Sequence, residues 1–158
     1  MYYFAYGANT DPNYLVQYID NENIDIFGSA YVENYILKYR NVNIPNIRSG
    51  VANLESRKGS KTYGVVYNFD NPDILSNIDT REGYISNNNP ENIYNKKILQ
   101  CKLLDTDETI SCYAYIMNDL KKKDERKPRF EYLSYLKNGN KIHGLPKEHL
   151  QRIQYLEK

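Results

Sequence analysis

A short turn near the N-terminus contains residues whose backbone could bind a ligand. Residues 2 to 6 are aromatic enough to predict a β-strand, and that strand ends abruptly at Gly7-Ala8-Asn9. A glycine permits close approach to the backbone, and N–H groups in a loop that leads into a helix can hold a carboxylate or an oxyanion. The same tripeptide also fits an ordinary strand-to-loop turn, with Asn9 as a turn or capping residue.

The other reactive side chains predict little chemistry. Cys101 and Cys112 are separated by ten residues and form no CxxC motif, so we expect two reduced thiols within strands rather than a zinc or redox site. His143 and His149 are the only histidines, too few for a histidine-based triad or a metal cluster. One histidine could act as a lone acid or base, but we expect both at the surface or at helix ends. We expect no metal and no organic cofactor.

Length and charge indicate one small domain with no overall attraction to nucleic acid or membranes. The 158 residues, 41% of them hydrophobic, fit a single domain over 1–158. The 21 Lys and Arg residues balance 20 Asp and Glu residues, so no overall charge attracts nucleic acid or a membrane. The one basic cluster, 121–127, contains its own acidic residues and predicts a solvated loop. Without a long apolar run or signal peptide, we expect a cytoplasmic monomer or homodimer with neither a nucleic-acid nor a membrane partner.

Most of the predicted elements that position these residues are strands. Strands are expected at 29–39, 50–54, 61–69, 94–104 and 109–117, with a turn at 105–107. Asp11 and Pro12 predict the start of a short helix that runs through about Tyr18.

A second short helix is predicted over 73–79, after Asn71-Pro72. It should stop before Arg81, which puts Glu82 just past a helix and beside a glycine. Residues 86–92 form an irregular loop. Helical spacing returns after Pro128 and again over 145–156, with a break at 138–140. The sum is an α+β protein with a β core closed by short helices.

Four separated segments form a recognisable pattern. The opening YFAYGAN is followed by GVA at 50–52 with YGVVY at 63–67, then IDTREG at 78–83, and finally Tyr132, Gly139 and GLP at 144–146. In this order and spacing the segments resemble the YFAYGSN loop, the paired internal strands, the LDxxEG segment and the C-terminal spacing of the γ-glutamylcyclotransferases. The resemblance to this AIG2-like family runs from residue 2 to about 156.

The resemblance implies a small mixed β-barrel flanked by short helices, with the loop and the glutamate in one cavity. In relatives the loop binds the α-carboxylate and the rest of the glutamyl head through backbone groups, and the glutamate is the catalytic acid and base. Carried over by position, the catalytic residue is Glu82, and the substrate-binding residues are Tyr6, Gly7, Ala8, Asn9, Tyr94 and Tyr132. For the last two tyrosines, plain core packing is an equal alternative.

Two features depart from the family pattern. Ala8 replaces the usual serine, which removes a hydroxyl but leaves the amide, so we expect a site built from backbone groups to survive. The insertion SNNNPEN at 86–92 lies between Glu82 and Tyr94, where relatives are shorter, and we expect it to affect the rim of the pocket.

The chemistry implied by the resemblance needs few protein groups. A γ-glutamyl compound carries its own nucleophile, because its α-amine can attack its γ-carbonyl and close the ring of 5-oxoproline. A shaped pocket would supply much of the rate enhancement by holding that cyclic geometry. One carboxyl group can then take a proton from the ammonium and return it to the leaving amine. We expect burial among apolar and aromatic neighbours to raise the pKa of Glu82 for this task.

Three hypotheses follow. The first is an enzyme that cyclises γ-glutamyl amino acids to 5-oxoproline and releases the free amino acid, with Asn9 favouring the dipeptide branch of the family. The second is a non-catalytic module that holds a small γ-glutamyl ligand in the same cavity, since Ala8 and the insertion alter the site. The third keeps the mechanism but acts on γ-glutamylamines or glutathione.

Overall fold

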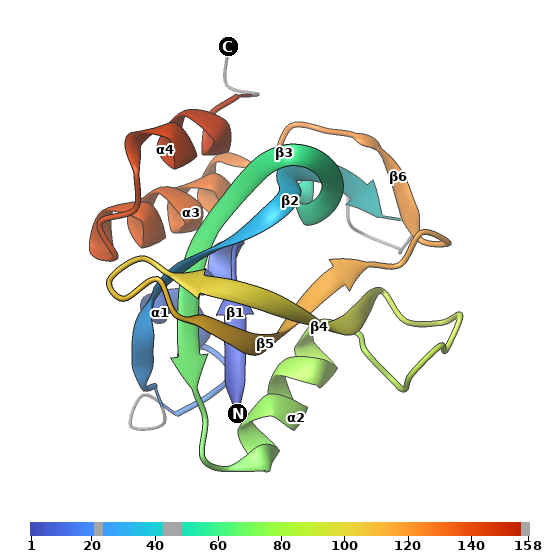
Figure 1. The fold of residues 1–158 in the computed structure, drawn as a ribbon. Helices are drawn as coiled ribbons and strands as arrows, with labels where there is room; N and C mark the ends of the chain where they lie inside the picture. The colour runs from blue at the N-terminus through green and yellow to red at the C-terminus, as the bar shows by residue number, and fades with distance from the viewer. Residues whose placement is uncertain (21–23, 43–48, 156–158) are drawn as a thin grey trace.

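The core of the protein is a closed, mixed β-barrel of five strands (Figure 1). The computed structural model describes residues 1–20, 24–42 and 49–155. Strands β1 (Tyr2–Ala5), β2 (Ile26–Val42), β3 (Val51–Asn68), β4 (Tyr94–Leu103) and β5 (Thr109–Met117) are ordered β3-β1-β5-β4-β2, and pairing of β2 with β3 closes the barrel. The β1–β5 pair is parallel, and the other pairs are antiparallel.

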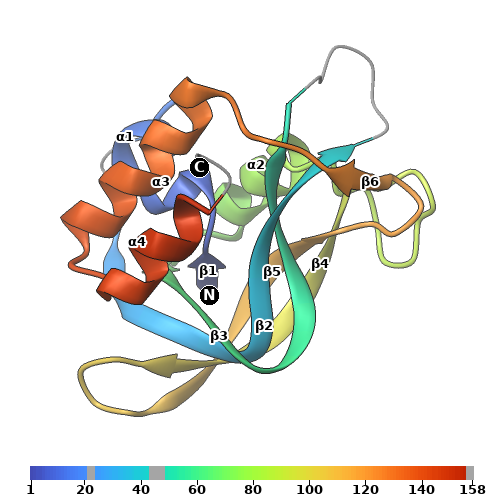
Figure 2. The ribbon, with the colours of Figure 1, turned by 90° about the horizontal axis from the view of Figure 1, so that it is seen from above.

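Short helices flank this barrel, which confirms the predicted α+β class. They are η1 (Ala8–Thr10), α1 (Pro12–Leu15), α2 (Pro72–Arg81), α3 (Phe130–Ile142) and α4 (Lys147–Ile153). Helices α3 and α4 lie together on one side of the barrel, and α2 lies at the end where the chain begins (Figures 1 and 2). In the described part of the chain, no helix has the length and apolar content needed to span a membrane.

Strand β1 is buried on both faces because it separates two apolar clusters. Phe4 packs into the barrel interior with Leu54 and Val66, among others. Tyr3, on the opposite face, packs with Tyr67 and with side chains of α2. The aromatic residues of the opening strand therefore serve two cores at once, since successive side chains of a strand point to opposite faces.

Strand β3 is longer than the sequence predicts. The separate strands expected at 50–54 and 61–69 are one 18-residue strand, in which Glu55, Ser56 and Lys61 are paired with β2 and residues 57–60 have no register partner there. These residues are largely exposed, so no apolar alternation marks them as a strand. Strand β2 bends there with a register shift between Glu33 and Tyr35, and Asn34 has a φ of 67°.

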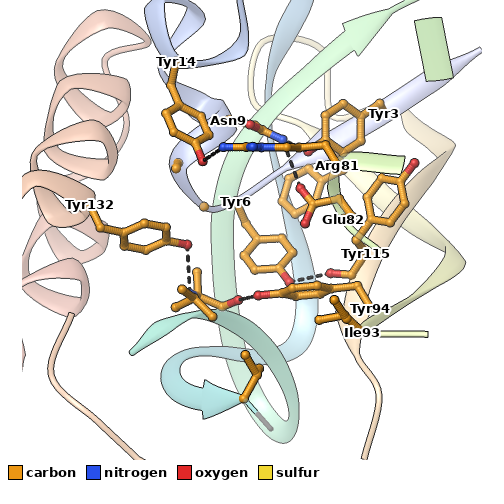
Figure 3. Close-up of a pocket in the computed structure, with 16 residues that line it drawn as sticks. Tyr3, Tyr6, Asn9, Tyr14, Arg81, Glu82, Ile93, Tyr94, Tyr115 and Tyr132 are labelled. Carbon is orange, nitrogen blue, oxygen red and sulfur yellow. Dashed lines mark hydrogen bonds between the residues drawn. The ribbon is translucent and has the colours of Figure 1, made fainter. Parts of the chain in front are cut away.

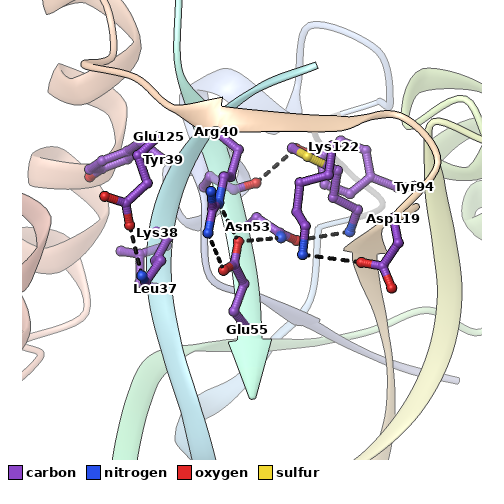
Figure 4. A network of polar contacts seen from close by, with 12 residues as sticks. Leu37, Lys38, Tyr39, Arg40, Asn53, Glu55, Tyr94, Asp119, Lys122 and Glu125 are labelled. Atoms are coloured by element: carbon purple, nitrogen blue, oxygen red, sulfur yellow. Dashed lines mark hydrogen bonds and ion pairs between the residues drawn. The ribbon is translucent and has the colours of Figure 1, made fainter. Parts of the chain in front are cut away.

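The prediction of a solvated loop over 121–127 is wrong for its central residues. Lys122–Glu125 form strand β6, which pairs with the end of β2 (Figure 4). The ion pair from Lys38 Nζ to Glu125 Oε1 measures 2.7 Å, and it joins the two strands side by side. The neighbouring Arg40–Glu55 pair, at 2.9 Å, links β2 to β3 in the same way. Opposite charges across the strands thus explain why such a polar segment pairs.

Helix α3 continues through the predicted break at 138–140. Gly139 is buried inside this helix, where the lack of a side chain lets Thr10 pack against it. A Cβ at this position would lie 2.1 Å from Thr10 Oγ1, so the glycine is needed for contact between α3 and η1 rather than for a turn.

The two histidines and the two cysteines have ordinary surroundings. His143 caps the C-terminus of α3, as predicted, and its Nε2 contacts the Thr10 carbonyl at 2.7 Å. His149 lies in the first turn of α4, one of the two predicted kinds of position, but it is buried and is not a surface residue. Cys101 and Cys112 are free, buried thiols on β4 and β5.

Candidate active site

A cavity of about 320 Å³ opens where the end of β1 meets the end of α2 (Figure 3). The structure brings every predicted site residue to its wall: Tyr6, Gly7, Ala8, Asn9, Glu82, Tyr94 and Tyr132. Sequence reasoning missed the other nine lining residues, which are Tyr3, Phe4, Tyr14, Val42, Val51, Ala52, Arg81, Ile93 and Tyr115. The loop 86–92, expected at the rim, contributes no residue to this wall.

The turn after β1 is held in place by its carbonyl groups. The Gly7 carbonyl accepts from the backbone N–H of Thr10 at 3.1 Å and from its hydroxyl at 2.7 Å. The Asn9 carbonyl accepts from Tyr67 Oη at 2.6 Å. A side chain on Gly7 would start 3.2 Å from the Ala52 Cβ, which explains why the wall has a glycine here. These carbonyls are used internally and are therefore not available to a ligand.

Asp11 confirms the predicted helix start just beyond the turn. Its side chain accepts from the Asn13 N–H at 2.9 Å, and Pro12 is the first helical residue. Helix α1 ends at Leu15, earlier than the predicted end at about Tyr18.

The end of α2 positions Glu82. The helix runs through Arg81, further than predicted, and Glu82 is its C-cap. Gly83 then takes a left-handed conformation with a φ of 68°, a common way for a helix to end. The N–H of Ile93 donates to the Gly83 carbonyl at 2.9 Å, and that of Tyr94 to the Glu82 carbonyl at 3.3 Å. These bonds tie the catalytic candidate to the start of β4 and bring Tyr94 alongside it.

Asn9 connects the turn to the Glu82 carboxyl. Its Nδ2 donates to Glu82 Oε1 at 3.3 Å and to Tyr3 Oη at 2.8 Å, while its Oδ1 accepts from Tyr18. The Asn9 side chain is buried, so this set of partners fixes its orientation. Asn9 therefore joins two motifs that lie more than seventy residues apart in the sequence.

The surroundings of Glu82 change its acidity. Burial raises its pKa from 4.5 to about 7, although the Arg81 charge and the Asn9 hydrogen bond oppose this shift. Glu82 keeps partial exposure to solvent. A carboxyl with a pKa near neutrality can both accept and donate a proton under ordinary conditions.

The tyrosine hydroxyls of the wall differ in what they can offer a ligand. Tyr94 Oη donates to the Ala52 carbonyl at 2.7 Å, and Tyr6 donates to the Tyr115 carbonyl, so both protons are used. Tyr132 Oη instead accepts the Ala52 N–H at 2.9 Å. Its own proton is available for a group in the cavity, which Tyr94 and Tyr6 cannot offer.

Arg81 and Tyr14 were not predicted as site residues. Arg81 Nη2 donates to Tyr14 Oη at 3.3 Å, and its guanidinium lies 5.3 Å from the centre of the Tyr18 ring. The one sequence signal for Arg81 was its position next to Glu82. An arginine in the last turn of a helix also suits the helix dipole, so that signal alone did not indicate a site.

Comparison with known proteins places the chain in a family. Residues 3–137 match the family described as gamma-glutamyl cyclotransferase, AIG2-like. No curated protein sequence gives a significant match. The chain thus belongs to the γ-glutamyl cyclotransferase, AIG2-like family.

Solved structures agree on the fold. An uncharacterized protein from Homo sapiens has a TM-score of 0.82 at 23% identity, over 97% of this chain and 85% of that one. A structure described as gamma-glutamyl cyclotransferase has a TM-score of 0.82 at 22% identity, over 98% of this chain and 86% of the other. YkqA from Bacillus subtilis has a TM-score of 0.79 at 21% identity, and the match covers 98% of this chain but only 53% of YkqA. At these identities the likeness establishes the shared fold.

Proposed function

We propose that this protein is a γ-glutamylcyclotransferase that converts a γ-glutamyl amino acid to 5-oxoproline and the free amino acid. The observation that carries the proposal is the Glu82 carboxyl, which lies in the cavity within hydrogen-bond reach of Asn9 and has a pKa near 7. Family membership supports the same reaction.

Each part of the reaction has a group suited to it. The amides of Gly7, Ala8 and Asn9 bind the α-carboxylate of the glutamyl head. Ionised Glu82 accepts a proton from the α-ammonium, and the freed amine attacks the γ-carbonyl carbon to form the ring C–N bond. The Tyr132 hydroxyl, whose proton is unused by Ala52, donates to the carbonyl oxygen as negative charge develops there.

Collapse of the tetrahedral intermediate completes the reaction. Neutral Glu82 gives its proton to the leaving nitrogen, and the bond between the γ-carbon and that nitrogen breaks. The ionised carboxylate then takes the second proton from the ring nitrogen, which leaves the neutral lactam N–H, and passes that proton to the released amine. Because nucleophile and electrophile belong to one molecule, the cavity needs only to hold the substrate folded. The aromatic wall of six tyrosines and Phe4 provides such a shape.

The test is release of 5-oxoproline from a γ-glutamyl dipeptide, glutathione and Nε-γ-glutamyl-lysine. Wild-type protein is compared with Glu82→Gln, and Glu33→Gln is the matched control because Glu33 is an exposed glutamate on β2. We expect release with wild type and with Glu33→Gln, and a loss of about 10²-fold or more with Glu82→Gln.

Other outcomes would replace the proposal. Full turnover by folded Glu82→Gln would contradict the mechanism. Stabilisation by γ-glutamyl compounds without any product would favour the non-catalytic binding module. A preference for glutathione or the lysine conjugate would assign the protein to another substrate branch with the same chemistry.

A further inference from the structure

Arg81 differs from every other residue of the cavity wall. Of the sixteen lining residues, it and Glu82 are the two that carry a charge, and Arg81 is the one that is exposed. The buried part of the cavity lies around Tyr6, Ala8 and Asn9. Arg81 therefore marks the solvent side of the site, where a variable leaving group would lie.

The guanidinium is positioned but not neutralised. Tyr14 of α1 accepts from Nη2 (Figure 3). The ring of Tyr18, which follows α1, lies 5.3 Å from the guanidinium, so this segment of the chain holds the Arg81 side chain at the cavity edge. Among the described residues, Arg81 forms no ion pair with a carboxylate, and Asn9 rather than Arg81 hydrogen-bonds Glu82. A guanidinium has five N–H donors, so donors remain for an anion.

The charges of the possible substrates indicate which anion the Arg81 guanidinium would bind. A glutamyl head carries one carboxylate and one ammonium, and the amides at 7–9 are already assigned to that carboxylate. A leaving amino acid adds a second carboxylate, whereas a leaving amine adds none. A cation at the solvent side complements the first substrate and not the second.

We propose that Arg81 binds the carboxylate of the leaving amino acid and selects γ-glutamyl amino acids over γ-glutamylamines. This assignment rests on the proposed function and names the residue that sets its substrate class. Arg81 forms a charge-assisted hydrogen bond to the leaving group and neither accepts nor donates the transferred proton.

The test uses two substrates that differ by one carboxylate, γ-glutamylalanine and γ-glutamylethylamine. The loss of the Arg81 charge also acts on the pKa of Glu82, and this effect is common to both substrates. For Arg81→Gln we therefore expect the ratio of kcat/KM for γ-glutamylalanine to that for γ-glutamylethylamine to fall about tenfold. Arg81→Lys keeps the charge and should retain part of the preference. Lys97→Gln, which removes an exposed cation from β4, is the matched control and should alter neither rate.

The outcomes separate the two proposals. An equal fall on both substrates would overturn the role of Arg81 and would indicate contact with the glutamyl head or a structural effect. The same fall in Arg81→Gln at high salt as at low salt would also count against a partly exposed ion pair. Release from neither substrate by wild-type protein would overturn the proposed function and, with it, the assignment of Arg81.

Discussion

Two hollows formed by residues that the structure describes each contain an ionisable side chain, and one of these two resembles an active site. The second hollow, of about 410 Å³, lies beneath α4 and is lined by Tyr63, Glu148, His149 and Arg152 together with Ile36 and residues 59–62. It is larger than the cavity around Glu82, so volume alone would select the wrong place. What the side chains can still do for a ligand separates the two.

The polar groups of the second hollow largely satisfy one another. Tyr63 Oη donates to Glu148 Oε1 at 2.6 Å, and Arg152 Nε donates to the Leu37 carbonyl at 2.8 Å. Burial lowers the pKa of His149 to about 4, so this imidazole is neutral at ordinary pH. In the Glu82 cavity, by contrast, the Tyr132 proton and the Arg81 charge remain available. Unused donors facing a shared space indicate function more clearly than size does.

The largest expected difference between the hollows is in catalysis. Glu82→Gln should lower kcat for 5-oxoproline release by about 10²- to 10⁴-fold, because the proton acceptor is lost. His149→Gln should change it less than about twofold, since His149 lies in the other hollow. Steady-state rates of both variants, with folding verified by circular dichroism, check this pair. A large loss of kcat in His149→Gln would indicate that the second hollow takes part in catalysis and would contradict the assignment of the active site.

The two groups should also have opposite effects on stability as pH changes. The pKa of Glu82 is raised from 4.5 to about 7. Its stabilising contribution to the free energy of unfolding is therefore fully present below pH 4.5 and is lost as pH rises through 7. The pKa of His149 is lowered from 6.5 to about 4. Its stabilising contribution to the free energy of unfolding is therefore present above pH 6.5 and is lost as pH falls through 4.

Single variants should reveal these opposing trends, which partly cancel in the wild type. Between pH 4.5 and 6.5 the free energy of unfolding should increase with pH more steeply in Glu82→Gln than in His149→Gln. Each shift alone changes the free energy of unfolding by about 2 kcal/mol over this window, so the two curves should diverge by at most about 4 kcal/mol, and by less because Glu82 is partly exposed. Urea unfolding at several pH values measures it, and parallel curves would show that the two environments are alike.

The smallest expected effect concerns one hydroxyl in each hollow. Tyr14→Phe removes the acceptor that positions Arg81 and should reduce the preference for γ-glutamylalanine over γ-glutamylethylamine about two- to threefold. Tyr63→Phe removes the hydroxyl that contacts Glu148 and should leave that preference unchanged. Competition between the two substrates in one assay would resolve such a small change. Equal effects of Tyr14→Phe and Tyr63→Phe on the substrate preference would contradict the claim that only the Glu82 cavity binds the substrate.

The site motifs were predictable because local sequence and family resemblance agreed on them. The turn Gly7-Ala8-Asn9 and Glu82 each have a short motif, and their meeting through Asn9 matches the expected cavity. The sequence also indicated that burial would raise the pKa of Glu82, as the structure shows.

What sequence reasoning missed depends on contacts between distant segments. Arg81 reads as an ordinary residue of a helix end until Tyr14, on another helix, is seen to hold it. Residues 55–61 lack apolar alternation, and Glu55, Ser56 and Lys61 join the strand by pairing with β2. His149 is buried because α4 packs against Tyr63, whose ring centre lies 6.0 Å from that of the imidazole. Tertiary packing decides each of these positions.

The pH dependence of kcat/KM for 5-oxoproline release from γ-glutamylalanine tests the role of Glu82 most directly. The free enzyme's catalytic base determines the rising limb of this profile. With Glu82 as that base, the rate should rise through pH 7 in wild type, and the residual rate of Glu82→Gln should lack this limb. A limb at pH 7 that persists in Glu82→Gln would show that another group accepts the proton, and would contradict the mechanism.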